Sequence, residues 1–243
     1  MGTDRRRRFE EGRRMARAVQ WTAAVRRVPG AVLRWVRSGP GTYLWLLLLA
    51  ATSFVVARMD PARLDWFLAA RSTNLENLRS DPVHVLVASA LWTEQSSFLL
   101  YFVLFTLFHA NAERWLGTPR WFTVAATAHV LATLVSEGVV ARGIMRGRLG
   151  ESLAGTVDVG VSYALAGVVA VLTYRFAGRW RLLYGGGVLV FYLVPLVGSH
   201  TFTDLGHFCA VLIGLCFFRF ARGRSRWDPG LLLRRRRERR AEV

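Results

Sequence analysis

Apolar residues in this chain gather into six long blocks with few charges, separated by short connections that carry arginine. The blocks cover residues 42–57, 96–112, 121–141, 157–174, 182–198 and 202–221. A helix needs about 20 apolar residues to cross a bilayer core of ~30 Å. The pattern therefore predicts an all-α membrane protein with six transmembrane helices.

The connection between the first two blocks, residues 58–95, has helix signals of its own. Cap-type residues 72–74 precede leucines at helical spacing, and residues 82–92 begin with proline and place apolar side chains at helical intervals. Its aromatic residues suited to the head-group region are Trp66, Phe67 and Trp92. We expect a re-entrant or interfacial segment here.

Composition narrows the class of protein. The 243 residues include 33 Lys+Arg, all of them arginine, and 16 Asp+Glu, for a net charge of +17, yet 53% of the chain is hydrophobic. This combination excludes intrinsic disorder and a soluble nucleic-acid-binding protein. The two cysteines lie in one apolar block and are interpreted as packing residues.

The arginines also indicate an orientation. Eleven precede the first block and ten lie from Arg219 onward. The positive-inside rule then places both termini in the cytoplasm, as an even number of spans requires, in a multi-pass protein of the plasma membrane. We expect a basic N-terminal arm (1–40), a membrane domain (41–221) and a basic C-terminal tail (222–243). The arms should lie on anionic lipids, since no aromatic interleaving indicates nucleic-acid binding.

Polar residues within membrane spans are costly and mark candidate functional sites. Three blocks carry them: His129, Thr133 and Glu137 in the third, Asp158, Gly160 and Ser162 in the fourth, and Asp204, Gly206 and His207 in the sixth. At 1.5 Å per residue, Ser162 and His207 both lie about 7.5 Å below the outer boundary. Equal depth on two helices is the minimum condition for a nucleophile and its base. The small residues Gly167, Ala210 and Gly214 would let the two helices approach closely.

These motifs resemble those of the rhomboid intramembrane serine proteases, and more closely the rhomboid-like membrane proteins of actinobacteria. The rhomboid fourth helix carries Gly-x-Ser-Gly with a small residue five positions after the serine, and the sixth carries a histidine followed by small residues. The matching residues here are Gly160, Ser162, Gly167, His207, Ala210 and Gly214, together with a Glu113…Gly117 pair at the end of the second helix. The resemblance implies a six-helix rhomboid fold, with Ser162 as nucleophile, His207 as general base, no cofactor, and transmembrane proteins as substrates.

Two positions depart from the rhomboid pattern. Rhomboids carry His-x-x-x-Asn in the second helix, which helps to hold the oxyanion, and these positions fall at Ser97 and Tyr101. Their hydroxyls, or backbone amides near Gly160 and Ser162, are the alternative donors. Tyr163 replaces the glycine after the serine, and its ring would either stand beside the nucleophile or point to lipid. Two hypotheses remain: an intramembrane protease, and a catalytically inactive rhomboid-fold protein that binds transmembrane helices of partner proteins.

The other polar residues have structural and functional interpretations. Asp158 and Asp204 stand at helix starts, where capping is favoured, although either would also suit orienting His207. Glu137 and His129 would suit a proton path or a metal, but the sequence has no His-Glu-x-x-His spacing, so we expect no metal site. A transporter using Glu137, Asp158 and Asp204 is less favoured, because there is no inverted repeat. His109 is expected at the inner interface.

Overall fold

The computed structural model describes residues 30–93, 98–158 and 160–231. The chain divides into two compact units, residues 1–40 and 41–243. In the first unit the described part forms a helix at Gly30–Arg37. The second unit contains the helices that concern function.

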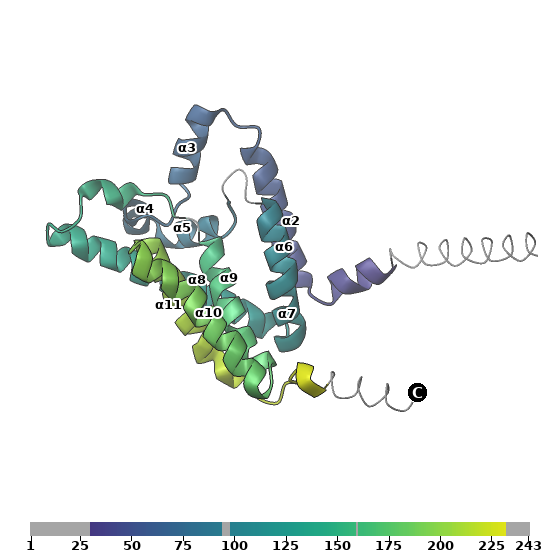
Figure 1. The fold of residues 1–243 in the computed structure, drawn as a ribbon. Coiled ribbons are helices and arrows are strands. Elements are labelled where there is room, and N and C mark those ends of the chain that lie inside the picture. The colour runs from purple at the N-terminus through teal and green to yellow at the C-terminus, as the bar shows by residue number, and fades with distance from the viewer. Residues whose placement is uncertain (1–29, 94–97, 159, 232–243) are drawn as a thin grey trace, which may run out of the picture. The chain divides into compact units, whose positions relative to one another are not determined.

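Helices account for almost all of the regular structure described (Figure 1). They are α2 (Pro40–Val56), α3 (Pro61–Ala69), α4 (Leu75–Ser80), α5 (Pro82–Ser89), α6 (Phe98–Leu104), α7 (Ala110–Leu116), α8 (Thr118–Met145), α9 (Val161–Val171), α10 (Gly178–Gly198) and α11 (Phe202–Cys216). A π-helical turn, Phe105–His109, joins α6 to α7, and 3₁₀ turns extend α9 and α11 to Arg175 and Ala221. Each of the six apolar blocks thus falls on a helix or a continuous helical run.

Fewer helices meet the length and hydropathy needed to cross a membrane than there are helical runs. Within the described residues, three helices are long and apolar enough to cross a membrane: α8, α10 and Phe202–Ala221. A fourth is added if Gly30–Arg37 and α2 form one bent span. The all-helical class of the described residues is confirmed, and the count of six remains a prediction.

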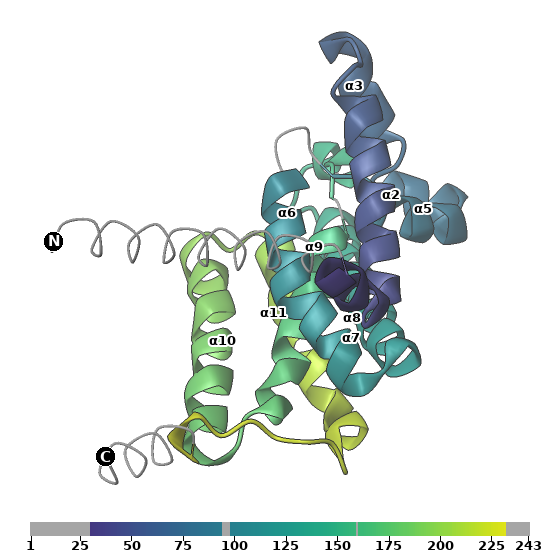
Figure 2. The same ribbon diagram turned by 90° about the vertical axis from the view of Figure 1, so that its right-hand side faces the viewer.

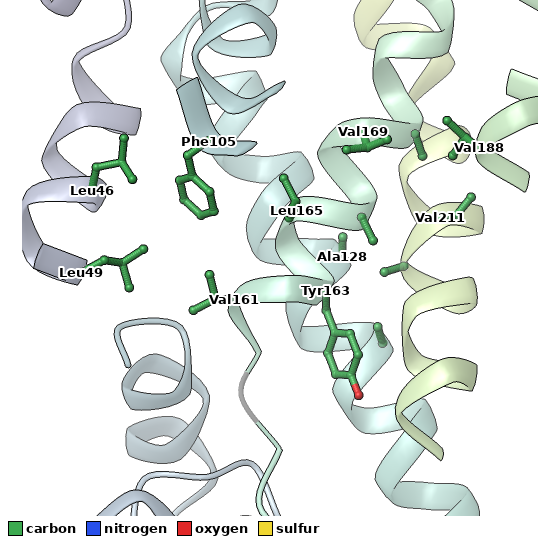
Figure 3. Close-up of a cluster of buried hydrophobic side chains, with 14 residues drawn as sticks. Leu46, Leu49, Phe105, Ala128, Val161, Tyr163, Leu165, Val169, Val188 and Val211 are labelled. Carbon is green, nitrogen blue, oxygen red and sulfur yellow. The ribbon is translucent and has the colours of Figure 1, made fainter. Parts of the chain in front are cut away.

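The core lies where α8, α9 and α11 pack on one another. Every residue of α9 except Ser162 is buried, so this short helix is enclosed by its neighbours. Figure 3 shows Tyr163, Leu165 and Val169 of α9 in this cluster, with Val211 on one side and Phe105 on the other. By contrast, α10 packs mainly on α11 and buries only Gly185 and Val188 (Figure 2).

Glu113, near the end of α7, holds the beginning of α2. Its Oε1 accepts hydrogen bonds from the Gly41 amide at 2.9 Å and the Thr118 hydroxyl at 2.7 Å. Its Oε2 accepts from the amide and hydroxyl of Thr42, at 2.8 and 2.7 Å. The first amides of a helix have no partner within the helix and carry its positive dipole end, so a buried carboxylate stabilises them. Gly117 is the single residue between α7 and α8. Its φ of 87° favours glycine and allows the sharp change of direction between the two helices.

The segment between α2 and α6 forms three helices, of which α4 is capped by one of the predicted cap-type residues and α5 begins at the predicted proline. Asn74 caps α4 by accepting from the Asn77 amide, and Asp81 caps α5 by accepting from the His84 amide, with Pro82 in the first turn. The helical reading of this connection is therefore confirmed. Helix α3, the first in the connection, is not among the elements that the sequence predicted.

Backbone carbonyls at the end of α5 form hydrogen bonds with side chains from α2 and α8. The carbonyl of Leu86 bonds His129 Nε2 at 2.8 Å, and that of Ala90 accepts from Trp45 Nε1 at 2.8 Å. His129 stands eleven residues after the first residue of α8, about 16 Å along its axis. The end of α5 thus packs near the middle of α8, while the choice between a re-entrant and an interfacial segment remains a prediction.

After α11 the chain runs back toward the beginning of α10, and residues 224–228 form what we name the C-terminal strap (Figure 2). At one end, Arg224 donates to the Leu116 carbonyl at 2.7 Å and Trp115 Nε1 donates to the Ser225 carbonyl at 2.8 Å. At the other, the Trp227 amide donates to the Arg175 carbonyl at 2.7 Å. The strap therefore ties the end of α7 to the segment between α9 and α10.

Replacing Glu113 with Gln should destabilise the fold, because an amide group would face donors that now meet a carboxylate oxygen. Leaving such buried donors unpaired costs about 2–4 kcal/mol of unfolding free energy. The measurement is the melting temperature in detergent, with Glu76→Gln on the exposed first turn of α4 as the matched control. Equal melting temperatures for the two variants would contradict this role of Glu113.

Candidate functional site

The two residues proposed as nucleophile and base stand on adjacent, parallel helices. Ser162 lies in the first turn of α9 and His207 in the second turn of α11, and both keep partial exposure. The register is set by glycines. A Cβ on Gly206 would stand 2.6 Å from the Tyr163 ring, and one on Gly214 would stand 2.2 Å from the Gly167 carbonyl oxygen. The small-residue stripes therefore bring α9 and α11 into backbone contact, with residues 163 and 206 level.

Tyr163 of α9 contacts His207. Its ring, drawn in Figure 3, is fully buried and meets the imidazole edge-on, with ring centroids 4.9 Å apart. Its hydroxyl donates to Asp158 Oδ2 at 2.8 Å. On the other side of His207, the Tyr192 ring of α10 lies at 5.9 Å. Of the two orientations expected for Tyr163, the one toward lipid is wrong, because the ring fills the space between α9 and α11.

Asp158 does not cap α9. The cap is Gly160, which has no side chain, while the Asp158 carboxylate accepts from Tyr163. The backbone of Asp158 is also held, because its amide donates to Ser72 Oγ at 2.6 Å and its carbonyl accepts from the Thr73 amide at 3.1 Å. Asp158 thus links the connection before α4 to the beginning of α9.

Asp204 is part of the cap of α11. Thr201 is the N-cap, and its hydroxyl accepts from the Asp204 amide at 3.1 Å. The Asp204 carboxylate in turn accepts from the hydroxyls of Thr201 and Ser199. The side chain that bonds a first-turn amide is that of Thr201, so capping of free amides by the Asp204 carboxylate itself remains a prediction.

The His129 ring of α8 packs directly against Gly160 at the beginning of α9. A Cβ on Gly160 would stand 1.8 Å from His129 Cε1, so only glycine leaves room for the ring at this position. With its Nε2 on the Leu86 carbonyl, His129 joins α5, α8 and α9. This gives His129 a structural role, where the sequence suggested a proton path or a metal.

Glu137 is buried on α8, and its Oε2 has no hydrogen-bond partner within the part of the chain that the structure describes. Thr133 is likewise buried one turn away, with an unbonded hydroxyl among the same residues. In the described ranges no three His, Cys, Asp or Glu side chains are grouped so that they could hold a metal ion.

Of the two oxyanion candidates in the second apolar block, only Tyr101 lies within the described residues. Ser97 lies outside the described residues. Tyr101 is half-buried on α6 and packs edge-on against Phe105, at 6.2 Å between ring centroids. It lies at the edge of the core cluster that includes α9.

His109 is fully buried and stacks on Phe105, with ring centroids 4.0 Å apart. Its expected depth at the inner interface remains a prediction. Its Nδ1 accepts from Trp121 Nε1 at 3.1 Å. The π-helical turn rotates this part of the helix relative to a regular α-helix, so helical spacing alone could not place the residue.

A family model described as a rhomboid-like protein matches residues 34–227. The chain belongs to the rhomboid-like family. This rhomboid-like chain is matched across all its helices from α2 to α11, which places the Ser162 and His207 region within the family's extent. Neither a curated protein nor a solved structure gives a match. Membership and the apolar helices together indicate a protein embedded in a lipid bilayer.

Placing a methyl group between α9 and α11 should destabilise this rhomboid-like protein. In Gly214→Ala the new Cβ would meet the Gly167 carbonyl, and such overpacking costs about 1–3 kcal/mol. Gly186→Ala is the matched control, because a Cβ there meets nothing within 4 Å and alanine is a better helix former. We expect the melting temperature in detergent to fall for the first variant and to stay level or rise for the second. A fall of equal size in both would show that the close approach is unimportant.

Proposed function

We propose that this rhomboid-like protein is an intramembrane serine protease in which Ser162 is the nucleophile and His207 the general base. The observation that carries the proposal is the exposure of α9: Ser162 is its single residue that is not buried, and it lies beside the residue that contacts His207. If α9 were simply a lipid-facing or core helix, nothing would favour a serine as its one partly exposed residue. This serine also lies level with a histidine on α11.

The chemistry follows from these two side chains. As Ser162 Oγ attacks the carbonyl carbon of the scissile peptide, its proton passes to a ring nitrogen of His207. The imidazolium then donates this proton to the leaving amine, and water releases the acyl group by the same route in reverse. The substrates are single-span membrane proteins cleaved just below the outer surface.

Asp158 and Tyr163 act as positioning residues in this proposal. The Tyr163 ring packs against the imidazole, and its hydroxyl is fixed on Asp158. Because Ser72 and Thr73 hold the Asp158 backbone, the ring is tied to the protein on two sides. This arrangement favours one orientation of the histidine.

The oxyanion would be held by backbone amides near Gly160 and Ser162, with the hydroxyls of Ser97 and Tyr101 as further donors. Removing one such donor from a serine protease costs about a hundred- to a thousandfold in rate. With neither residue of the His-x-x-x-Asn motif present, we expect slow turnover compared with a site that has both.

The proposed topology completes this picture. We infer six spans with both termini in the cytoplasm of a plasma-membrane protein, supported by the arginines at both ends and by the helical run over each apolar block. The basic arms then lie on anionic lipid, and the Ser162 end of α9 faces outward.

The direct test is covalent labelling of the detergent-purified protein with fluorophosphonate probes of several sizes, to allow for the nearby ring of Tyr163. We expect labelling of the wild type, loss in Ser162→Ala, and loss or strong reduction in His207→Ala. Ser80→Ala, on the exposed end of α4, is the matched serine control and should label fully. Labelling that persists in Ser162→Ala would overturn the assignment.

The second candidate is a catalytically inactive protein that binds transmembrane helices of partners. It is favoured by the helices with unburied apolar faces: α6 buries none of its residues, and α10 leaves Leu182 and Phe191 at least 70% exposed. A correctly folded protein that no probe labels, but that binds single-span helices in vesicles equally well as wild type and as Ser162→Ala, would establish this function in place of proteolysis.

A further inference from the structure

A cavity lies at the opposite end of α9 from Ser162. It has a volume of about 420 Å³ and opens between the end of the second helical run and the beginning of α10. Sites for small molecules commonly measure about 300–1,000 Å³. Leu107, Phe108 and Leu172 give it apolar walls, while Asn111 and Arg175 are its polar lining residues apart from tyrosine and tryptophan rings.

The C-terminal strap forms one boundary of this cavity. Trp227 lines it, and backbone hydrogen bonds on both sides of Phe176 hold Trp227 in place: its amide donates to Arg175 and its carbonyl accepts from Ala177. The Phe176 ring stacks on Tyr184 at 4.7 Å and lies 5.4 Å from the Trp227 ring. An aromatic wall therefore stands next to the arginine.

Arg175 is the charged residue of the cavity. It is half-buried at the end of the 3₁₀ turn that follows α9. Its carbonyl is used by the strap, but among the described residues its guanidinium has no carboxylate or other side-chain partner. A partly buried cation without a counter-ion is costly, so an anionic ligand would relieve that cost.

We propose that this cavity binds an anionic phospholipid, with the phosphate on the Arg175 guanidinium and an acyl chain along Leu107, Phe108 and Leu172. A lipid fits better than a free phosphate because Leu107, Phe108 and Leu172 give the cavity apolar walls beside the guanidinium, which suit an acyl chain and offer nothing to a free anion. In the proposed topology this end of the helices faces the cytoplasmic leaflet, where anionic lipids are concentrated. The site is independent of the proteolytic proposal, since it shares no residue with it.

The test uses full-length protein in phosphatidylcholine vesicles containing a phosphatidylglycerol with a photoactivatable acyl chain. We expect crosslinks at residues 107–111 and 172–184, removed by excess phosphatidylglycerol but not by phosphatidylcholine. Inorganic phosphate and glycerol phosphate should not compete. Competition by either at concentrations near that of the lipid would identify a free-anion site and overturn the lipid assignment.

Two variants that each remove one positive charge distinguish binding at this site from general attraction to the many other arginines. Arg175→Gln should weaken the apparent Kd for phosphatidylglycerol at these peptides about tenfold, as expected for loss of a charge-assisted contact. Arg179→Gln, exposed at the start of α10 and stacked on Trp180, should change it less than about twofold. Equal effects of both variants would reduce the binding to general surface attraction and refute the proposal. The melting temperature in pure phosphatidylcholine verifies folding, and fluorophosphonate labelling reports separately on Ser162.

Discussion

The structure depends on one constraint: backbone groups at helix ends that are enclosed by other helices need partners from the protein, since neither apolar side chains nor lipid offer any. Three polar side chains meet it. The Glu113 carboxylate takes the first amides of α2, the His129 imidazole takes a carbonyl near the end of α5, and the Ser72 hydroxyl takes the amide of Asp158 just before α9. Each contact joins segments at least 43 residues apart, so they place the short helices relative to the long ones.

The same polar contacts connect the candidate site to the connection between α2 and α6. His129 lies against Gly160 at the beginning of α9 while it bonds α5. Asp158, held by the segment before α4, holds Tyr163 in turn, and Tyr163 contacts His207. A displacement of α4 and α5 would therefore be felt at both helices that carry the proposed serine and histidine. The connection between α2 and α6 is thus joined to the site by hydrogen bonds and packing.

Local features of the sequence were sufficient for most of the helices, although α3 was not predicted. Hydropathy located all six helical runs, and the cap of α4 lies at Asn74, among the cap-type residues that the sequence offered. Features set by distant segments could not be predicted: the roles of His129 and Asp158 depend on partners 43 and 86 residues away. The pairing of α9 with α11 was predicted from small-residue spacing, and the structure brings these helices together. The spans, the catalysis and the roles of Ser162 and His207 remain predictions.

The C-terminal strap has a consequence for the order of assembly. Its residues follow every apolar block in the chain, so they leave the ribosome after all the helical runs have been made. Until then, the strap's hydrogen bonds to the end of α7 and to the segment before α10 cannot form. Closure of this end therefore follows synthesis of all the helices, and a chain truncated before residue 224 would lack the hydrogen bonds that join α7 to the segment before α10.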